Sequence, residues 1–397
     1  MTLTAELAAA IDRAVDACEA DLIALARRIH DNPELRFEEH KASAWLGEFV
    51  ASRGHAVERG VAGMDTAFRA QAGTGSGPCI ALLAEYDALP GIGHACGHNL
   101  IAAGAVGAFV AAAAAASGVG AAVGNVVLLG TPAEEGGGGK IRMIDAGVFR
   151  GVDAAMMFHP FDRDLLAHTA LASSWLTFDF TGKPSHAAIA PHAGRSALTA
   201  CLDTFRLIDG QRVHFRDGVR VHGFVTNGGQ AINIIPERAA CEFNVRALDG
   251  KELDRVRAIV ERCARAAAMA SDVEVAMHVR EGYRDMVNNM ALARRFGAHL
   301  AALGRKSRER DESVGAGSTD MGDVSHVVPS IHPWLAIVSE GVASCHERPF
   351  EEAAGTDHAG RTAVLAAKAL ARTAIEFLTD PELRAAVSAE WRSRLGV

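Results

Sequence analysis

The segment from Gly93 to Asn99, GHACGHN, places a cysteine and two histidines within five residues. It lies shortly after the apolar stretch 79–84, CIALLA. Thiolate sulfur and imidazole nitrogen are the ligands that zinc and similar transition metals prefer in proteins. A single cysteine or histidine in such a place is more often structural, so a metal site requires further ligands from elsewhere in the chain.

Further polar residues follow two later apolar stretches. Glu134 and Glu135 come after the stretch 126–129, and His159 comes after the stretch 154–158. In open α/β sheets, ligands bind beyond the carboxyl ends of the strands. We therefore expect one thiol, two imidazoles and two carboxylates at one edge of a sheet. Such a set can hold two metal ions about 3.5 to 4 Å apart, while one of the two adjacent carboxylates stays free as a general base.

The spacing of apolar residues predicts the elements that position this set. From residue 78 onward, short apolar runs alternate with helical stretches, which is typical of an α/β fold with parallel strands. We predict strands at 80–84, 126–129 and 154–158, and helices at 4–29, 41–53, 100–116 and 140–146. The longest apolar run, Leu100 to Ala116, is short and Ala-rich for a membrane span, so it predicts a buried helix.

The middle of the chain has a different pattern. Strands at 174–180, 219–226 and 239–245 occur with helices at 193–207 and 251–270, which predicts an α+β unit with an antiparallel sheet. After residue 285 the chain returns to a helix at 289–304, a strand at 334–338 and a long helix at 357–378. We therefore predict a smaller unit, 168–282, inserted into a domain formed by 1–167 and 283–397.

Composition excludes several classes of function. With 40 Lys and Arg against 48 Asp and Glu, the net charge is −8, which argues against a nucleic-acid partner. The acidic first 22 residues do not form a signal peptide, so we expect a cytoplasmic protein that does not bind membranes.

Seven widely spaced cysteines fit buried or functional thiols better than disulfides. The segment EEGGGGK, 134–140, matches a phosphate-binding loop only at its last two residues, so we reject nucleotide binding.

Five segments in chain order resemble the M20 amidohydrolases, a metallopeptidase family of aminoacylase and carboxypeptidase type. They are DALPGIGHACGHN, GTPAEEGGGGK, GKPSHAA, QAINIIPERA and GSTDMGDVS. Within the family they resemble the branch of p-aminobenzoyl-glutamate hydrolases and aminoacylase-1-like dipeptidases. The resemblance implies a zinc-peptidase-like α/β catalytic domain with a mixed sheet flanked by helices, interrupted by a smaller α+β lid or dimerisation domain through which two chains form a homodimer.

The resemblance also implies an activity. Members hydrolyse an amide bond in an N-acyl or aminoacyl amino acid, such as a dipeptide or p-aminobenzoyl-glutamate, using metal-activated water and two divalent ions, Zn²⁺ or Mn²⁺. By resemblance Cys96 is the bridging ligand of the two ions. His98 and His159 complete one metal site, while Glu135 and His346, from the segment SCHERPF, complete the other.

The remaining roles also come from the resemblance. Glu134 would be the general base, and Asp87 would orient the metal ligands. His186, from the inserted unit, would bind the developing oxyanion, and Asn233 and Arg246 would meet the carboxylate side of the substrate. We do not expect His94 to bind metal, so it is either structural or a contact of a metal ligand, and Asn99 stands where the family usually has Asp.

Three other interpretations remain open. Cys96 as a nucleophile would need a histidine base but no pair of carboxylates. Deaminase-type hydrolysis of another C–N bond could use a similar metal core, although zinc deaminases require a Pro-Cys-x-x-Cys segment that this sequence lacks. A non-enzymatic binding protein on the same fold would be expected to lack a ligand or the base, whereas all six positions are filled here.

Overall fold

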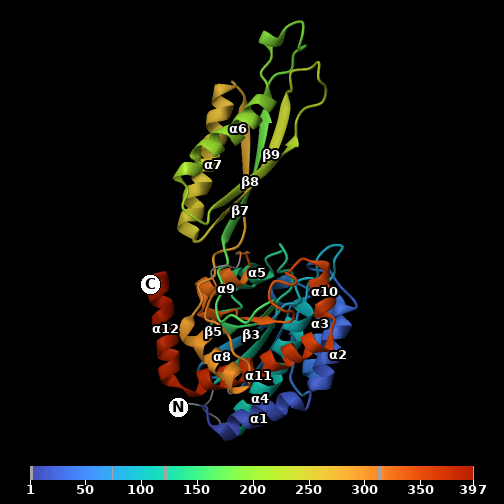
Figure 1. Cartoon of the computed structure of the whole chain (residues 1–397), viewed down its shortest axis with the longest axis vertical. Coiled ribbons are helices and arrows are strands. Elements are labelled where there is room, and N and C mark those ends of the chain that lie inside the picture. Colours follow the sequence, from blue (N-terminus) through green and yellow to red (C-terminus); the bar gives the residue numbers. More distant parts are fainter. Residues whose placement is uncertain (1–2, 74, 120–123, 312–314, 316, 397) are drawn as a thin grey trace. The chain divides into compact units, whose positions relative to one another are not determined.

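The computed structural model describes residues 3–73, 75–119, 124–311, 315 and 317–396. The chain forms two compact units (Figure 1). Unit 1 contains Met1–His168 and Met286–Val397, and unit 2 contains Thr169–Asp285. The predicted class, an α/β domain interrupted by a smaller α+β unit, is confirmed.

Unit 1 is built on a six-stranded mixed sheet of order β1-β2-β4-β3-β5-β11. The parallel part contains β4 (Asn125–Gly130), β3 (Cys79–Ala84), β5 (Ala154–Met156) and β11 (Ser330–Ile331). At one edge β2 (Phe68–Gly73) pairs antiparallel with β4, and β1 (Val57–Arg59) with β2. A separate parallel pair joins β6 (His159–Phe161) to β12 (Trp334–Ala336). Strands β3 and β4 are buried along their whole length, as expected for strands covered on both faces.

The central helix of unit 1 is α4 (His98–Val119), which packs against α11 (Asp357–Thr379). Two glycines of α4 allow other residues of the core to pack closely against this helix. A Cβ on Gly104 would lie 2.5 Å from the Phe158 ring, and a Cβ on Gly107 would lie 2.7 Å from Leu22. By length and composition its segment His98–Ser117 could cross a membrane, but 83% of the apolar window is buried inside unit 1. The predicted buried helix is confirmed.

The other helices of unit 1 surround this core. The single helical stretch expected at 4–29 is two helices, because the chain breaks at Ala17 and Cys18. The helices are α1 (Ala5–Asp16), α2 (Glu19–His30), α3 (His40–Ala51), α5 (Gly139–Asp145), α8 (Met290–Ala302), α9 (Met321–Val327), α10 (Arg348–Ala354) and α12 (Pro381–Leu395), with a 3₁₀ turn η1 (Val61–Gly63).

Unit 2 is an antiparallel sheet of order β10-β7-β9-β8 with α6 (Ala197–Gln211) and α7 (Gly250–Ala270) side by side on one face (Figure 1). Its strands are β7 (Ala172–Thr181), β8 (Arg220–Asn227), β9 (Arg238–Ala247) and β10 (Glu274–Glu281), and 3₁₀ turns occur at η2 (Pro191–Ala193) and η3 (Arg212–His214). Strand β7 starts, and β10 ends, within a few residues of the two crossings to unit 1. Both crossings therefore lie at the same end of this sheet, and the loop after β7 lies at the other end.

Candidate active site

The carboxyl ends of the parallel strands bring the predicted metal ligands together. Three groups of side chains have potential ligand atoms that all lie within 4.8 Å of one another. The groups are Cys96, His98 and His159; Cys96, Glu135 and His346; and His98, Glu134 and Glu135. The first two groups share Cys96 and match the two metal sites that the resemblance implies.

His346 is the ligand candidate most distant in sequence from the others. It belongs to the loop before α10, where its backbone N–H donates to the Ala95 carbonyl over 2.8 Å. Its Nε2 lies 3.2 Å from Glu135 Oε1. Cys96 and Glu135 raise the pKa of His346 to about 10 in the metal-free protein. The backbone contact fixes His346 beside the segment that carries Cys96.

Asp87 connects two of these ligand positions. Its Oδ1 lies 2.9 Å from His98 Nδ1, and its Oδ2 accepts from the Glu135 backbone N–H over 2.9 Å. Burial alone would raise the pKa of Asp87, but His98 and Lys140 hold it below its ordinary value. Because Asp87 occupies Nδ1, His98 offers Nε2 to the cluster, which is the orientation that a metal-binding imidazole needs.

The glycine-rich segment after β4 is a tight turn that presents Glu134 and Glu135. Ala133 has a positive φ of 61°, and Gly136 and Gly138 have φ values of 86° and 65°. A Cβ on Gly139 would lie 1.8 Å from the Pro132 carbonyl oxygen. The four glycines therefore allow the chain to fold back on itself directly after the two carboxylates.

The two adjacent carboxylates have different electrostatic environments. Burial, Glu135 and Glu85 raise the pKa of Glu134 well above its ordinary value. Burial also acts on Glu135, but its contact with His346 and the charge of His98 lower its pKa overall. Neighbouring acids whose environments separate their pKa values are typical of sites where one group transfers protons and the other stays ionised.

The cluster fits divalent cations. Glu85 Oε2 and His98 Nε2 lie 3.6 Å apart, and both are buried without a hydrogen-bond partner among the described residues. Buried polar atoms normally have partners, so this arrangement suits a cation that the protein binds. A thiolate, imidazoles and carboxylates together suit zinc or a similar metal. The neighbouring Cys345 thiol and burial raise the pKa of Cys96, so metal binding would release its proton.

Sequence reasoning missed a buried ion pair network beside the cluster. Lys140 is fully buried and forms ion pairs with Glu85 and with Asp320, the latter over 2.6 Å. The Lys140 backbone N–H also donates to Asp320 Oδ2 over 3.1 Å. The segments EEGGGGK and GSTDMGDVS both contributed to the resemblance, but no local signal pairs residues 180 positions apart.

Glu39 was also missed, although it supports the turn that carries Glu134. It is buried, and its Oε1 accepts from the N–H groups of Phe37 and Ala133 over 2.8 and 2.9 Å. Burial, with the charge of Asp87, raises the pKa of Glu39 from 4.5 to about 7. A raised pKa favours the protonated acid in the folded state. The contribution of Glu39 to the stability of the folded state is therefore complete below pH 4.5, and it is lost as the pH rises through about 7.

Two further residues of the first motif, His94 and Asn99, lie outside the three ligand groups. His94 is buried, its ring centroid lies 6.3 Å from that of His30, and it belongs to none of the three ligand groups found among the described residues. The Asn99 amide donates to the carbonyls of Ala26 and Ala354 over 3.2 and 3.0 Å, so it joins α2 to the end of α10.

The predicted residues of unit 2 lie in two places. His186 is exposed, and its Nδ1 accepts from the N–H groups of Ala188 and Ile189 over 3.2 Å each, which leaves Nε2 to carry the proton of the neutral ring. The Asn233 carbonyl accepts from Ala187 N–H over 2.9 Å, so Asn233 is beside His186. Arg246 lies opposite Ser173 near the start of β7, at the other end of the sheet.

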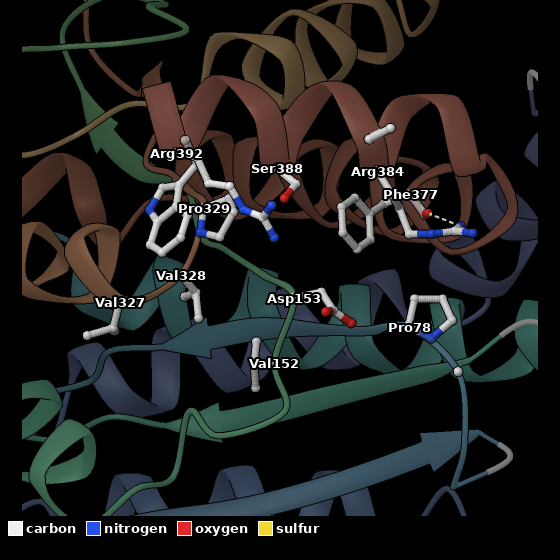
Figure 2. Close-up of a pocket in the computed structure, with 13 residues that line it drawn as sticks. Pro78, Val152, Asp153, Val327, Val328, Pro329, Phe377, Arg384, Ser388 and Arg392 are labelled. Carbon is white, nitrogen blue, oxygen red and sulfur yellow. Dashed lines mark hydrogen bonds between the residues drawn. The ribbon is translucent and has the colours of Figure 1, made fainter. Parts of the chain in front are cut away.

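A pocket of about 630 Å³ lies at the amino ends of the parallel strands, whereas the candidate metal ligands lie beyond their carboxyl ends (Figure 2). It is bordered by Pro78 before β3, Asp153 before β5 and Pro329 before β11. Arg384 of α12 also borders it and donates to the Phe377 carbonyl over 2.9 Å. None of the predicted site residues lines this pocket.

Comparison with known sequences identifies relatives along nearly the whole chain. The chain is 37% identical over 397 residues to the Xaa-Arg dipeptidase of Mus musculus, covering 96% of this chain and 91% of the relative. It is 29% identical to one of the subunits of p-aminobenzoyl-glutamate hydrolase from Escherichia coli, covering 94% and 92%.

Solved structures share the fold. An M20 peptidase from Bacillus subtilis described as dinuclear metal-binding matches with a TM-score of 0.71 and 21% identity, covering 92% of this chain and 99% of that one. An aminobenzoyl-glutamate utilization protein from Klebsiella pneumoniae matches with a TM-score of 0.69 and 17% identity, covering 94% and 99%.

The family model of peptidase family M20/M25/M40 matches residues 81–372, a range that begins in β3 and ends in α11. This range contains all the residues of the three ligand groups, and the family expected from the five motifs is confirmed. The chain belongs to peptidase family M20/M25/M40 and is a hydrolase of that family.

Proposed function

We propose that this protein hydrolyses the amide bond of a dipeptide or an N-acyl amino acid with two divalent ions, Zn²⁺ or Mn²⁺. The observation that carries the proposal is the pair of ligand groups that share Cys96. The 37% identity to an Xaa-Arg dipeptidase favours a dipeptide with a basic carboxyl-terminal residue. The more distant p-aminobenzoyl-glutamate hydrolase makes that compound the second substrate to test.

Cys96, His98, His159, Glu135 and His346 would hold the two ions. When bound, the ions supply Lewis-acid activation of the amide carbonyl and of water. Asp87 keeps His98 in the required tautomer and holds the Glu135 backbone in place through its second oxygen.

Glu134 is the proposed general base. As water adds to the amide carbon, Glu134 takes one of its protons. It then donates that proton to the amide nitrogen while the C–N bond breaks, so the products are a carboxylic acid and an amine. The buried setting that raises the pKa of Glu134 suits it to both transfers near neutral pH.

His186 would bind the oxyanion that develops on the carbonyl oxygen. Its Nδ1 accepts two backbone hydrogen bonds, so its Nε2–H is available as the donor. Asn233, beside it, and Arg246 would bind the carboxylate side of the substrate. Because Asn233 and Arg246 lie at opposite ends of unit 2, we propose that one substrate meets them from two different chains.

The position of His186 within unit 2 supports this arrangement. The loop with His186 follows the ten residues of β7, so at about 3.3 Å per residue it lies roughly 30 Å from the crossing at Thr169. Rotation of unit 2 about that crossing leaves this distance unchanged. On the other side of the crossing, His168 is 3.1 Å from His332, whose ring centroid is 5.3 Å from that of His159. We therefore propose a homodimer in which each site receives His186 from its partner.

A substrate screen tests the proposed function. The protein is stripped with a chelator, reloaded with Zn²⁺ or Mn²⁺, and assayed against Xaa-Arg and Xaa-Lys dipeptides, p-aminobenzoyl-glutamate and N-acetyl amino acids. We expect metal-dependent release of amino acid from at least one dipeptide class. Hydrolysis that persists after complete metal removal, or a fully loaded protein without activity on any of these amides, would contradict the proposal.

A further inference from the structure

One buried histidine at the sheet edge has no role in the mechanism above. His332 follows β11, which pairs in parallel with β5, the strand that leads to His159. The backbone N–H of His159 donates to the Pro333 carbonyl over 2.9 Å. The two rings meet edge to face, with centroids 5.3 Å apart and an interplanar angle of 82°. The sheet therefore places His332 directly beside a proposed metal ligand.

One nitrogen of His332 is fixed by an adjacent histidine. Its Nδ1 lies 3.1 Å from Nε2 of His168, and both rings are buried. His168 is itself stacked on Trp334, with centroids 4.2 Å apart, and its carbonyl accepts from the Asn288 amide over 2.8 Å. The His332 ring is therefore held in one orientation by a rigid set of neighbours.

The other nitrogen has no assigned contact. His332 Nε2 is buried without a hydrogen-bond partner among the described residues. His332 also belongs to none of the three groups of potential metal ligands in that part of the chain. A buried, unpaired imidazole nitrogen beside a catalytic cluster requires an explanation, and a substrate atom that enters the cluster would supply the partner.

The charges around His332 indicate which kind of substrate atom would bind to its Nε2. The side chains of His168, His159, Lys140 and His98 all lie near His332. Lys140 is a cation, but its charge is balanced by ion pairs with Glu85 and Asp320, so the positive charge of this region would come from the proposed metal ions. Such surroundings favour an electron-rich oxygen over a substrate ammonium group.

We propose that His332 is a substrate-binding residue of the catalytic centre, and that its Nε2–H donates a hydrogen bond to a carbonyl or carboxylate oxygen of the substrate. His168 is a positioning residue that donates Nε2–H to His332 Nδ1 and so leaves the proton of His332 on Nε2. The proposal rests on the proposed function, since it assumes an amide substrate at the metal cluster. In this proposal the substrate contacts a residue of unit 1 in addition to His186, Asn233 and Arg246 of unit 2.

Two substitutions at His332 distinguish the role of Nε2 from that of Nδ1. His332→Gln places an amide N–H near the position of Nε2, whereas His332→Asn reaches only the position of Nδ1. We expect kcat/KM for the best dipeptide to fall about tenfold in H332N, the usual effect of one lost hydrogen bond, and to stay within about threefold of wild type in H332Q. Metal content should be unchanged in both. The control is His94→Asn, which removes another buried histidine of unit 1 and should leave kcat/KM unchanged.

A binding measurement provides a second readout. In the inactive Glu134→Gln background, calorimetry with the intact dipeptide should give a Kd about tenfold higher when H332N is added and little change when H332Q is added. Equal losses in H332N and H332Q, or wild-type values in both, would refute the role of His332. If wild type hydrolyses no amide of the panel and E134Q binds no dipeptide, the proposed function fails and this proposal fails with it. Normal wild-type hydrolysis with an unaffected H332N refutes the His332 proposal alone.

Discussion

Mixing two inactive variants tests whether His186 acts on the partner's site. Glu134→Gln removes the general base from its own metal cluster and leaves its His186 intact. His186→Ala removes the oxyanion donor and leaves its own cluster intact. Because His186 lies roughly 30 Å from its crossing to unit 1 by the length of β7, each variant should supply the residue that the other lacks.

The expected recovery follows from two-fold symmetry. Random exchange between equal amounts of the two variants makes about half of the dimers mixed. In a mixed dimer, the site that carries the E134Q substitution stays inactive, while the site with Glu134 receives an intact His186 from its partner. One of its two sites is therefore active, and the mixture should reach about a quarter of wild-type activity.

The assay requires proof that the two chains exchange. The two variants carry different affinity tags, are mixed under mild dissociating conditions and are returned to buffer with metal. Tandem purification isolates the mixed dimers, which should have about half of the wild-type kcat. Isolated mixed dimers without activity would refute the contribution in trans and would mean that His186 acts within its own chain or has no catalytic role.

Three further substitutions test individual residues. Glu134→Gln should retain both metal ions by elemental analysis while kcat falls about 10² to 10⁴-fold, as is typical for loss of a general base; near-normal kcat would exclude this role. Asp87→Asn should weaken metal binding about 10- to 100-fold in competition with a chelating dye, because the contact that orients His98 is disturbed; unchanged affinity would contradict that account. Glu39→Gln should raise the thermal midpoint of the metal-free protein at pH 8 by about 4 °C and leave it unchanged near pH 4.5, since a pKa of about 7 against 4.5 corresponds to about 3 kcal/mol. An equal shift at both pH values would show that the effect does not come from ionisation of Glu39.

The cluster of candidate metal ligands was predictable because it follows from a rule about parallel strands. The apolar runs of β3, β4 and β5 are evident in the sequence, and residues just after such strands meet at one edge of the sheet. Cys96, Glu135 and His159 are all placed in this way. His346 comes from a loop far along the chain, and only the family resemblance pointed to it.

The supporting contacts were not predictable, because they join segments that no local pattern relates. Lys140 and Asp320 form a buried ion pair across 180 residues, and His168 contacts His332 across 164. Short elements such as β1 were missed because three residues, VER, carry no periodic pattern.

The central claim is that Cys96 joins two metal ions in one site, and a crystal grown with Zn²⁺ tests it most directly. An anomalous difference map should show two peaks in unit 1 about 3.5 to 4 Å apart, both about 2.3 Å from Cys96 Sγ. His98 and His159 should contact one peak, and Glu135 and His346 the other. A single peak, or two peaks of which only one contacts Cys96, would contradict the account.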